Sequence, residues 1–219
     1  MRRLTASIAL CLLVAGCATV PGAPPPPPAP PGEGASGGGT VLRDWRGVVT
    51  PTDRDRLNRL DAAWRLALEQ ARRQEGSGDL RSTGDLIDPG AARRDVEPPE
   101  GAYRCRTVKL GSQSDGGLGY VVYGWFACQI ERTPNGLKLS KLTGSQRPAG
   151  LLFPENDRSM VFLGSMSLAD EAPARTYGRN PARDVVARLE RIGDARWRLV
   201  IPFPQTESNL DLIELVPAR

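Results

Sequence analysis

The 219-residue sequence contains no histidine. Without an imidazole, the chain has no base for a Ser-His-Asp triad, no partner for a Cys-His pair and no histidine ligand for a metal ion. The Ser-x-x-Lys motif, the P-loop and the EF-hand loop are missing as well. We therefore predict that the protein is not an enzyme and that it uses neither a metal ion nor another cofactor.

Cysteine is also scarce, and two of the four cysteines lie within the first 17 residues. Arg2 and Arg3 are followed by a short apolar stretch, Ala6–Ala15, and then by Gly16 and Cys17. The apolar stretch is too short for a permanent membrane helix. The pattern resembles the lipobox of bacterial lipoprotein signal peptides, which implies that Cys17 is lipidated and becomes the mature N-terminus. In the alternative, an ordinary secretory leader, Cys17 is incidental.

Residues 18–40 are rich in proline and glycine. The proline part is expected to be extended polyproline II and the glycine part a flexible coil, and neither can bury a core. We interpret the segment as a tether, with a proline-motif ligand as the alternative. The chain then divides into a signal peptide (1–17), a tether (18–40), a helical region with turns (41–100) and a β domain (101–219), the last two forming one folded unit.

Neither sign of charge is in large excess. With Arg2 and Arg3 removed, 27 basic and 25 acidic residues remain, which gives no strong field for nucleic acid. Ala18 follows Cys17, and by resemblance to the lipoprotein sorting rule this favours the outer membrane, with the folded domain facing the periplasm or the cell surface. We expect the membrane as a partner through the lipid anchor, together with an envelope protein or polymer.

An amphipathic helix is predicted near Pro51–Gln74. Thr50 is a suitable cap, Pro51 fits the first turn, and Asp53 stands where a capping acid would. The predicted apolar stripe has the three-and-four spacing of a helix and consists of Leu57, Leu60, Trp64, Ala67, Leu68 and Ala71. We expect this stripe to pack on the β domain. A short helical segment is expected over Leu80–Ile87.

Gly101–Glu131 reads as two β-strands joined by a glycine-rich loop. In the first strand Tyr103, Cys105 and Thr107 share a face, and in the second we place Val122, Phe126, Cys128 and Ile130 on one face. An oxidising envelope and the forced choice of partner predict a Cys105–Cys128 disulfide. Two separate buried thiols, or a redox-active pair, are the alternative. Tyr123 and Trp125 lie on the other face of the second strand, which a helix or a strand covers unless it is a recognition patch.

Strand follows strand beyond Glu131. The apolar runs at Leu137–Thr143, Gly150–Phe153, Ser159–Gly164, Val185–Ile192, Arg196–Ile201 and Leu210–Val216 are separated by turn residues, with a polar loop or bend at Gly144–Pro148. Seven or eight closely spaced, mostly antiparallel strands favour a barrel or a sandwich. The predicted fold class is α+β, mainly β, with the N-terminal helix packed on a lipocalin-like barrel or a sandwich.

Several short motifs between Trp45 and Pro217 carry a family resemblance. They include Asp53–Leu57, Tyr103–Arg106, Leu142–Pro148, Tyr177–Arg179, Arg196–Leu199 and Leu210–Pro217. With these motifs the chain resembles an uncharacterised family of alphaproteobacterial secreted proteins, domain of unknown function 4893. The resemblance supports the fold and the location and implies no activity.

Carboxylate pairs occur, but they have structural explanations. Asp53 and Asp55 lie in the opening turn of the predicted helix, where acids favour the helix dipole. Asp211 and Glu214 lie in the last strand, and Glu214 falls on its apolar face. Glu214 is therefore either a buried acid paired with an arginine or a residue near the exposed end of the strand, and a functional role remains open.

Three functions are compatible with the sequence. The favoured one is a lipid-anchored, non-enzymatic module that binds an envelope protein or polymer. A sharper variant of it is an inhibitor that acts through a loop at Ser145, Gln146 and Arg147. Tyr123 and Trp125 are further candidate binding residues. The first alternative is a carrier with a small ligand in a lipocalin-like pocket. The second is a carboxylate-dependent hydrolase, which needs two buried carboxylates at one cleft.

Overall fold

The computed structural model describes residues 44–173 and 176–218. The predicted lipidation site Cys17 and the predicted tether 18–40 lie outside the described residues. The helices are η1 (Trp45–Gly47), α1 (Pro51–Asn58), α2 (Leu60–Arg73) and η2 (Arg81–Ile87). The strands are β1 (Gly76–Ser77), β2 (Gly101–Leu110), β3 (Tyr120–Thr133), β4 (Gly136–Lys141), β5 (Gln146–Pro154), β6 (Ser159–Leu168), β7 (Asp184–Gly193), β8 (Arg196–Pro202) and β9 (Leu210–Pro217).

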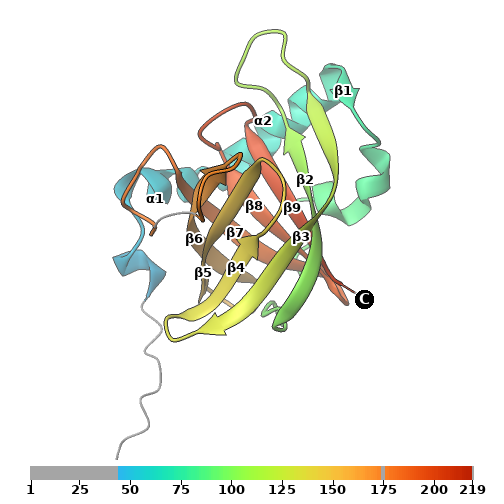
Figure 1. Ribbon diagram of the computed structural model, residues 1–219. Coiled ribbons are helices and arrows are strands. Elements are labelled where there is room, and N and C mark those ends of the chain that lie inside the picture. The colour runs from blue at the N-terminus through green and yellow to red at the C-terminus, as the bar shows by residue number, and fades with distance from the viewer. Residues whose placement is uncertain (1–43, 174–175, 219) are drawn as a thin grey trace, which may run out of the picture. The chain divides into compact units, whose positions relative to one another are not determined.

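Strands β2 to β9 form a closed antiparallel barrel (Figure 1). Each strand pairs with the next one along the chain, and β9 returns to pair with β2. The short strand β1 adds in parallel to the start of β3. This up-and-down order is that of a lipocalin-like barrel. The predicted class, α+β and mainly β, is confirmed, and the choice between barrel and sandwich is settled in favour of the barrel.

The barrel interior is filled by side chains. Alternate residues of every strand point inward, because successive side chains of a strand face opposite sides. One apolar cluster runs through the interior and includes Leu139, Phe162, Leu189, Leu199 and Leu215, all essentially inaccessible to solvent. The rings of Tyr103 and Trp197 meet edge to face with their centroids 6.1 Å apart. An eight-stranded barrel is just wide enough for its side chains to fill it, which leaves ligand space mainly at the ends.

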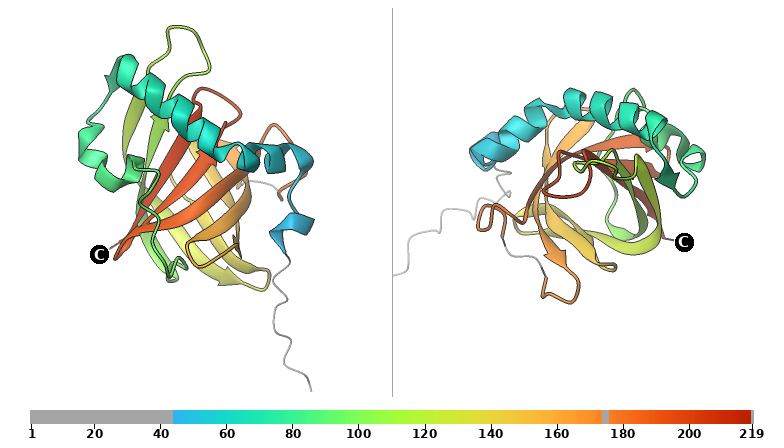
Figure 2. Two further views of the ribbon diagram at one scale, coloured as in Figure 1. Left: turned by 180° about the vertical axis from the view of Figure 1, so that it is seen from behind. Right: turned by 90° about the horizontal axis from the view of Figure 1, so that it is seen from above.

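Helices cover part of the outer surface of the barrel (Figure 2). The apolar side of α2, including Leu60, Trp64 and Ala67, packs in one cluster with Val108, Leu110, Val200, Leu210 and Leu212 of β2, β8 and β9. Trp45 and Leu57 pack with Val161, Leu163 and Val186 of β6 and β7. Among residues 44–173 and 176–218, no helix combines the length and the apolar character needed to cross a membrane.

The prediction of a single helix over Pro51–Gln74 is wrong in one respect. The helix is interrupted at Arg59, whose backbone leaves the helical region at φ −97° and ψ 13°. The break lets Leu57 pack on β6 and β7 while Leu60 and Trp64 pack on β8 and β9. The N-terminal prediction is confirmed, since the Thr50 hydroxyl accepts a hydrogen bond from the Asp53 amide at 3.3 Å.

The Cys105–Cys128 disulfide is confirmed, with the two Cα atoms 5.9 Å apart. The two residues are diagonal neighbours, because Cys105 pairs with Phe126 and Cys128 with Tyr103. The face assigned to Val122 is wrong. A register shift between Arg106 and Val108 inserts a bulge in β3, so that Val122 packs outside against the α2 cluster while Phe126 packs against the interior.

Arg198 is the largest fully buried side chain, with no exposed surface. Its guanidinium pairs with Glu190 at 2.7 Å. It also donates to backbone carbonyls in the last turn of η2 and just after it, at Asp85, Leu86, Asp88 and Pro89. It also lies 5.0 Å from the ring centroid of Trp64. One side chain of β8 therefore fixes both α2 and the segment 85–89 on the outer wall of the barrel.

Candidate functional site

One end of the barrel gathers the charged side chains that the interior lacks. We call this end the mouth. It is the end at which residues 111–119, 142–145, 169–173, 176–183 and 203–209 connect the strands. Three adjoining cavities at the mouth all have Lys109 as a lining residue. The mouth is therefore where a ligand would meet both charge and enclosed space.

The mouth cavity, as we call the most apolar of these spaces, has a volume of about 90 Å³. Four of its lining residues are charged and buried: Arg56, Lys109, Asp184 and Asp211, each with 2–7% of its surface exposed. Its apolar lining includes Met166, Val185 and Ile201. Pockets for drug-sized ligands measure roughly 300–1,000 Å³, so this cavity suits a small molecule or one end of a larger one.

Lys109 and Asp211 form a buried ion pair at the centre of the mouth. The Lys109 ammonium lies 3.0 Å from Asp211 and 3.1 Å from Glu207. Burial works against the charged form of Lys109, but the two carboxylates outweigh it and raise its pKa. The other Asp211 oxygen accepts a hydrogen bond from the Ser208 hydroxyl. Both oxygens of Asp211 are thus engaged within the protein.

Arg56 joins α1 to the mouth. Its guanidinium lies 2.7 Å from Asp53 and donates to the carbonyl of Phe203 at 2.9 Å. The other oxygen of Asp53 accepts a hydrogen bond from the Tyr177 hydroxyl at 2.7 Å. Burial raises the pKa of Tyr177, so this phenol stays protonated and can donate. Two of the family motifs, Asp53–Leu57 and Tyr177–Arg179, therefore meet here and fasten the β6–β7 connection to α1.

Asp184 differs from the other buried charges of the mouth cavity. Its Oδ1 atom accepts a hydrogen bond from the Gly178 amide at 3.0 Å. Its Oδ2 atom is buried and, among the described residues, has no hydrogen-bond partner. Burial raises the pKa of this carboxyl, and the nearby Asp53 adds to the effect, while the Gly178 amide and Arg56 oppose it. The Oδ2 atom of Asp184 is therefore a buried hydrogen-bond acceptor to which no described residue donates.

A second space, the side cavity, has a volume of about 110 Å³ and is lined by three of the predicted binding residues, Tyr123, Ser145 and Gln146. Lys109 and Lys141 are the basic residues that line the side cavity. The Lys141 ammonium donates to the carbonyls of Thr143 and Gln146 at 2.9 and 2.8 Å and lies 4.0 Å from the Phe126 ring centroid. Burial, followed by Arg147 and Lys109, lowers the pKa of Lys141 to about 8. This lysine holds the 142–146 turn in place.

The pKa of Lys141 predicts how stability changes with pH. Between about pH 8 and 10.5 the unfolded lysine binds a proton that the folded one has lost, so the free energy of unfolding rises with pH by about 1.4 kcal/mol per unit. Urea unfolding of the wild type and Lys141→Met across this range should show the rise only in the wild type. Lys138→Met, which changes an outward lysine of the same strand, is the control and should keep the rise. Parallel pH profiles for wild type and Lys141→Met would contradict the prediction.

The remaining predicted binding residues lie elsewhere. Arg147 donates to the carbonyls of Gly144 and Glu171, at 3.0 and 2.8 Å, and to that of Ala169. It ties two mouth connections together. Gln146, Arg147 and Pro148 belong to β5, so the predicted loop or bend is shorter than Gly144–Pro148. Trp125 is exposed on the outer wall, and the guanidinium carbons of Arg104 and Arg106 lie 4.6 and 5.0 Å from its ring centroid.

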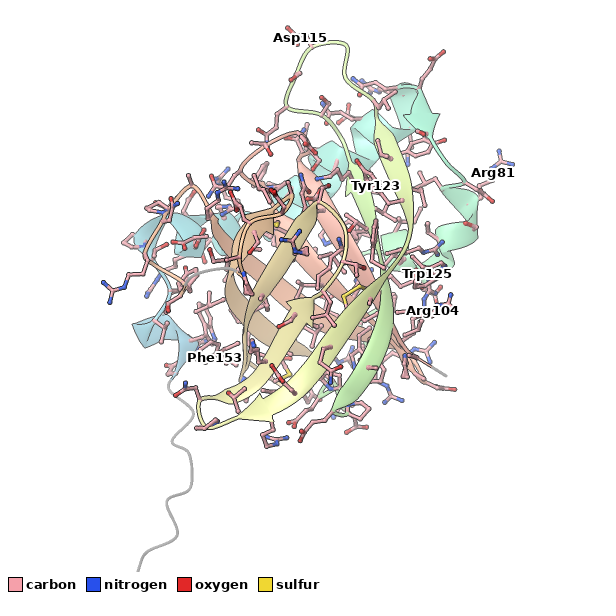
Figure 3. The ribbon with its side chains drawn as sticks, viewed as in Figure 1. Arg81, Arg104, Asp115, Tyr123, Trp125 and Phe153 are labelled. Atoms are coloured by element: carbon pink, nitrogen blue, oxygen red, sulfur yellow. A yellow bond between two sulfur atoms is a disulfide. The ribbon has the colours of Figure 1, made fainter. Side chains whose placement is uncertain are left out.

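Figure 3 shows Tyr123 and Trp125 at different heights along β3, with Tyr123 nearer to the Asp115 end of the molecule and Trp125 beside Arg104. The side chains of Arg104 and Arg106 lie against Trp125, which remains 41% exposed. The bulge in β3 separates the two aromatic residues, which strict alternation places on one face.

Glu214 has a structural role on the outer wall. It is 3% exposed and pairs with Arg106 and Arg196, which come from the strands on either side. Arg196 also donates to the carbonyl of Thr83 at 2.7 Å. The first of the two readings of Glu214, a buried acid paired with an arginine, is therefore confirmed, and Glu214 lies outside the mouth.

Sequence reasoning missed the four buried charges of the mouth cavity as a group. The alternation of Cys105 and Thr107 in β2 indicates that Lys109 also points inward. Asp211 is opposite Lys109 in the β2–β9 register. Arg56 and Asp184 carried no such signal, because Arg56 comes from α1 and Asp184 is the first residue of β7, after the β6–β7 connection. In the part of the chain that the structure describes, no three Cys, Asp or Glu side chains are grouped in a way that could hold a metal ion.

Comparison with known families identifies the chain. A profile described as a domain of unknown function (DUF4893) matches residues 45–215, which is most of the sequence, so the chain belongs to this family. No curated protein and no solved structure matches the chain.

Proposed function

We propose that this member of the DUF4893 family is a binding protein, without catalytic activity, that takes its ligand at the mouth of the barrel. One observation carries the proposal: four buried charged residues line a small cavity at the end of a barrel whose interior holds a buried apolar cluster. Buried charges in a concave space are typical of functional sites, since each carries a desolvation cost that packing alone does not require.

The size of the mouth cavity favours a particular kind of ligand. A volume of about 90 Å³ accommodates a terminal group or a small molecule, and buried residues of the interior cluster, Val185 and Ile201, form part of its wall. This supports recognition of the end of an envelope polymer, a peptide side chain or a small metabolite over transport of a bulky hydrophobic compound. Within the proposal, Cys17 carries lipid and anchors the domain at the outer membrane, and residues 18–40 give it reach.

A hydrolase is the second candidate, and a specific observation favours it. Asp184 and Asp211 both line the mouth cavity, and glycosidases use two carboxylates. The contacts weigh against this reading, because Asp211 is held by Lys109 and Ser208 and only Asp184 has an unused oxygen. A pair of catalytic carboxylates would need both groups available to the substrate.

The proposal is tested by nuclear magnetic resonance titration of the full chain with four probes: butylammonium, acetate, inorganic phosphate and N-acetylglucosamine. At least one probe should shift the amide signals of Lys109, Gln146 and Asp211 in a saturable manner. If all four leave these signals unchanged, the proposal fails. Turnover of 4-nitrophenyl glycosides that is lost in Asp184→Asn and Asp211→Asn would establish the hydrolase instead.

A further inference from the structure

The charged side chains that line the mouth cavity have ion-pair partners, with one exception. Lys109 pairs with Asp211 at 3.0 Å, Arg56 with Asp53 at 2.7 Å and Arg183 with Glu171 at 2.7 Å. Asp184, which is 2% exposed, has no ion-pair partner among the described residues. Arg56 is near enough to influence it, but the Arg56 guanidinium is already bonded to Asp53 and Phe203.

Resting on the proposed function, we infer that the mouth cavity binds the ammonium group of a small primary alkylamine, with Asp184 Oδ2 as the acceptor. A buried carboxylate with a free oxygen needs both a hydrogen-bond donor and a positive charge. An ammonium supplies both, whereas a neutral hydroxyl supplies the donor only. A carboxylate or phosphate ligand would add a second uncompensated negative charge to the same space.

The other lining residues of the mouth cavity indicate which alkyl chain this amine carries. Met166, Val185 and Ile201 provide an apolar wall, which suits a short alkyl chain. The volume of about 90 Å³ limits the chain to a few carbon atoms. Gln146, Gln205 and Thr206 also line the space and supply neutral polar groups near its opening. A small diamine or an aminoalcohol has the required combination of ammonium head and short stem.

The inference is tested by calorimetric titration of the full chain with butylammonium and with 1-butanol, its neutral counterpart of similar size. We expect saturable binding of butylammonium, and binding of 1-butanol that is weaker by about 10-fold or more, because hydrogen bonds to a charged group are the stronger class. Asp184→Asn keeps the shape of the side chain and should weaken butylammonium binding by about 10- to 100-fold. Asp170→Asn, an exposed change in the same β6–β7 connection, is the matched control and should bind as the wild type does.

Three results of these titrations would contradict the inference. Absence of butylammonium binding, equal binding of 1-butanol, or unchanged binding by Asp184→Asn each overturns it. Because Asp184→Asn could also disturb folding, a second measurement uses the wild type. Butylammonium should lower the pKa of the Asp184 carboxyl, which is measured from its carbon-13 chemical shift. An unchanged pKa contradicts the inference. If acetate, phosphate or N-acetylglucosamine still shifts the mouth signals, only the choice of ligand fails. If no probe does, the proposed function fails with it.

Discussion

Replacing Arg198 with methionine should lower the free energy of unfolding by about 3–5 kcal/mol. The substitution leaves Glu190 buried without its counter-ion and removes the donor that serves the carbonyls of Asp85, Leu86 and Asp88. A buried charge without a partner is costly because the protein interior replaces its hydration poorly. Chemical unfolding followed by circular dichroism measures the loss.

Two further variants show whether the effect comes from the buried pair. The double variant Arg198→Met with Glu190→Met should be more stable than Arg198→Met alone, since removing both charges avoids the orphaned carboxylate. Arg65→Met, which changes an exposed arginine of α2, should stay within about 0.5 kcal/mol of the wild type. A loss below about 1 kcal/mol for Arg198→Met would contradict the role assigned to this residue.

Replacing Trp64 with alanine should cost about 3–5 kcal/mol. Trp64 is 5% exposed, packs in the cluster between α2 and strands β2, β8 and β9, and lies against Arg198. Truncation leaves a cavity and removes the aromatic face from the guanidinium. Equilibrium unfolding of the variant measures the loss.

Leu66→Ala is the matched control for Trp64. Leu66 belongs to the same helix but is 40% exposed, so its truncation should change stability little. If Trp64→Ala lowers the free energy of unfolding as little as Leu66→Ala does, α2 is not docked on the barrel. The Trp64 and Arg198 variants should also be non-additive when combined, because the two side chains are in contact.

Local patterns predicted much of the fold. The two-residue alternation of Tyr103 and Cys105 and the three-and-four spacing of Leu60, Trp64 and Ala67 depend only on neighbours along the chain, and both faces are buried as expected. The disulfide followed from the shortage of other partners. The break at Arg59 and the bulge in β3 were missed, because each results from fitting a regular element to a curved barrel wall.

The candidate site was predicted less completely, for a physical reason. Tyr123, Ser145 and Gln146 meet at the side cavity, but the charges of the mouth cavity come from α1, β2, β7 and β9. Their pairing depends on strand register and on the course of the β6–β7 connection, neither of which hydrophobic periodicity specifies. Arg198 likewise points outward from β8, and it is buried only because η2 and α2 cover it.

The central claim is that the mouth receives the ligand and the barrel interior does not. The most direct test measures nuclear Overhauser effects between butylammonium protons and the methyl groups of the full chain. We predict contacts with Met166, Val185 and Ile201, which line the mouth cavity. Contacts with Leu139 or Leu189 in the interior, or with the indole of Trp125 on the outer wall, would contradict the claim.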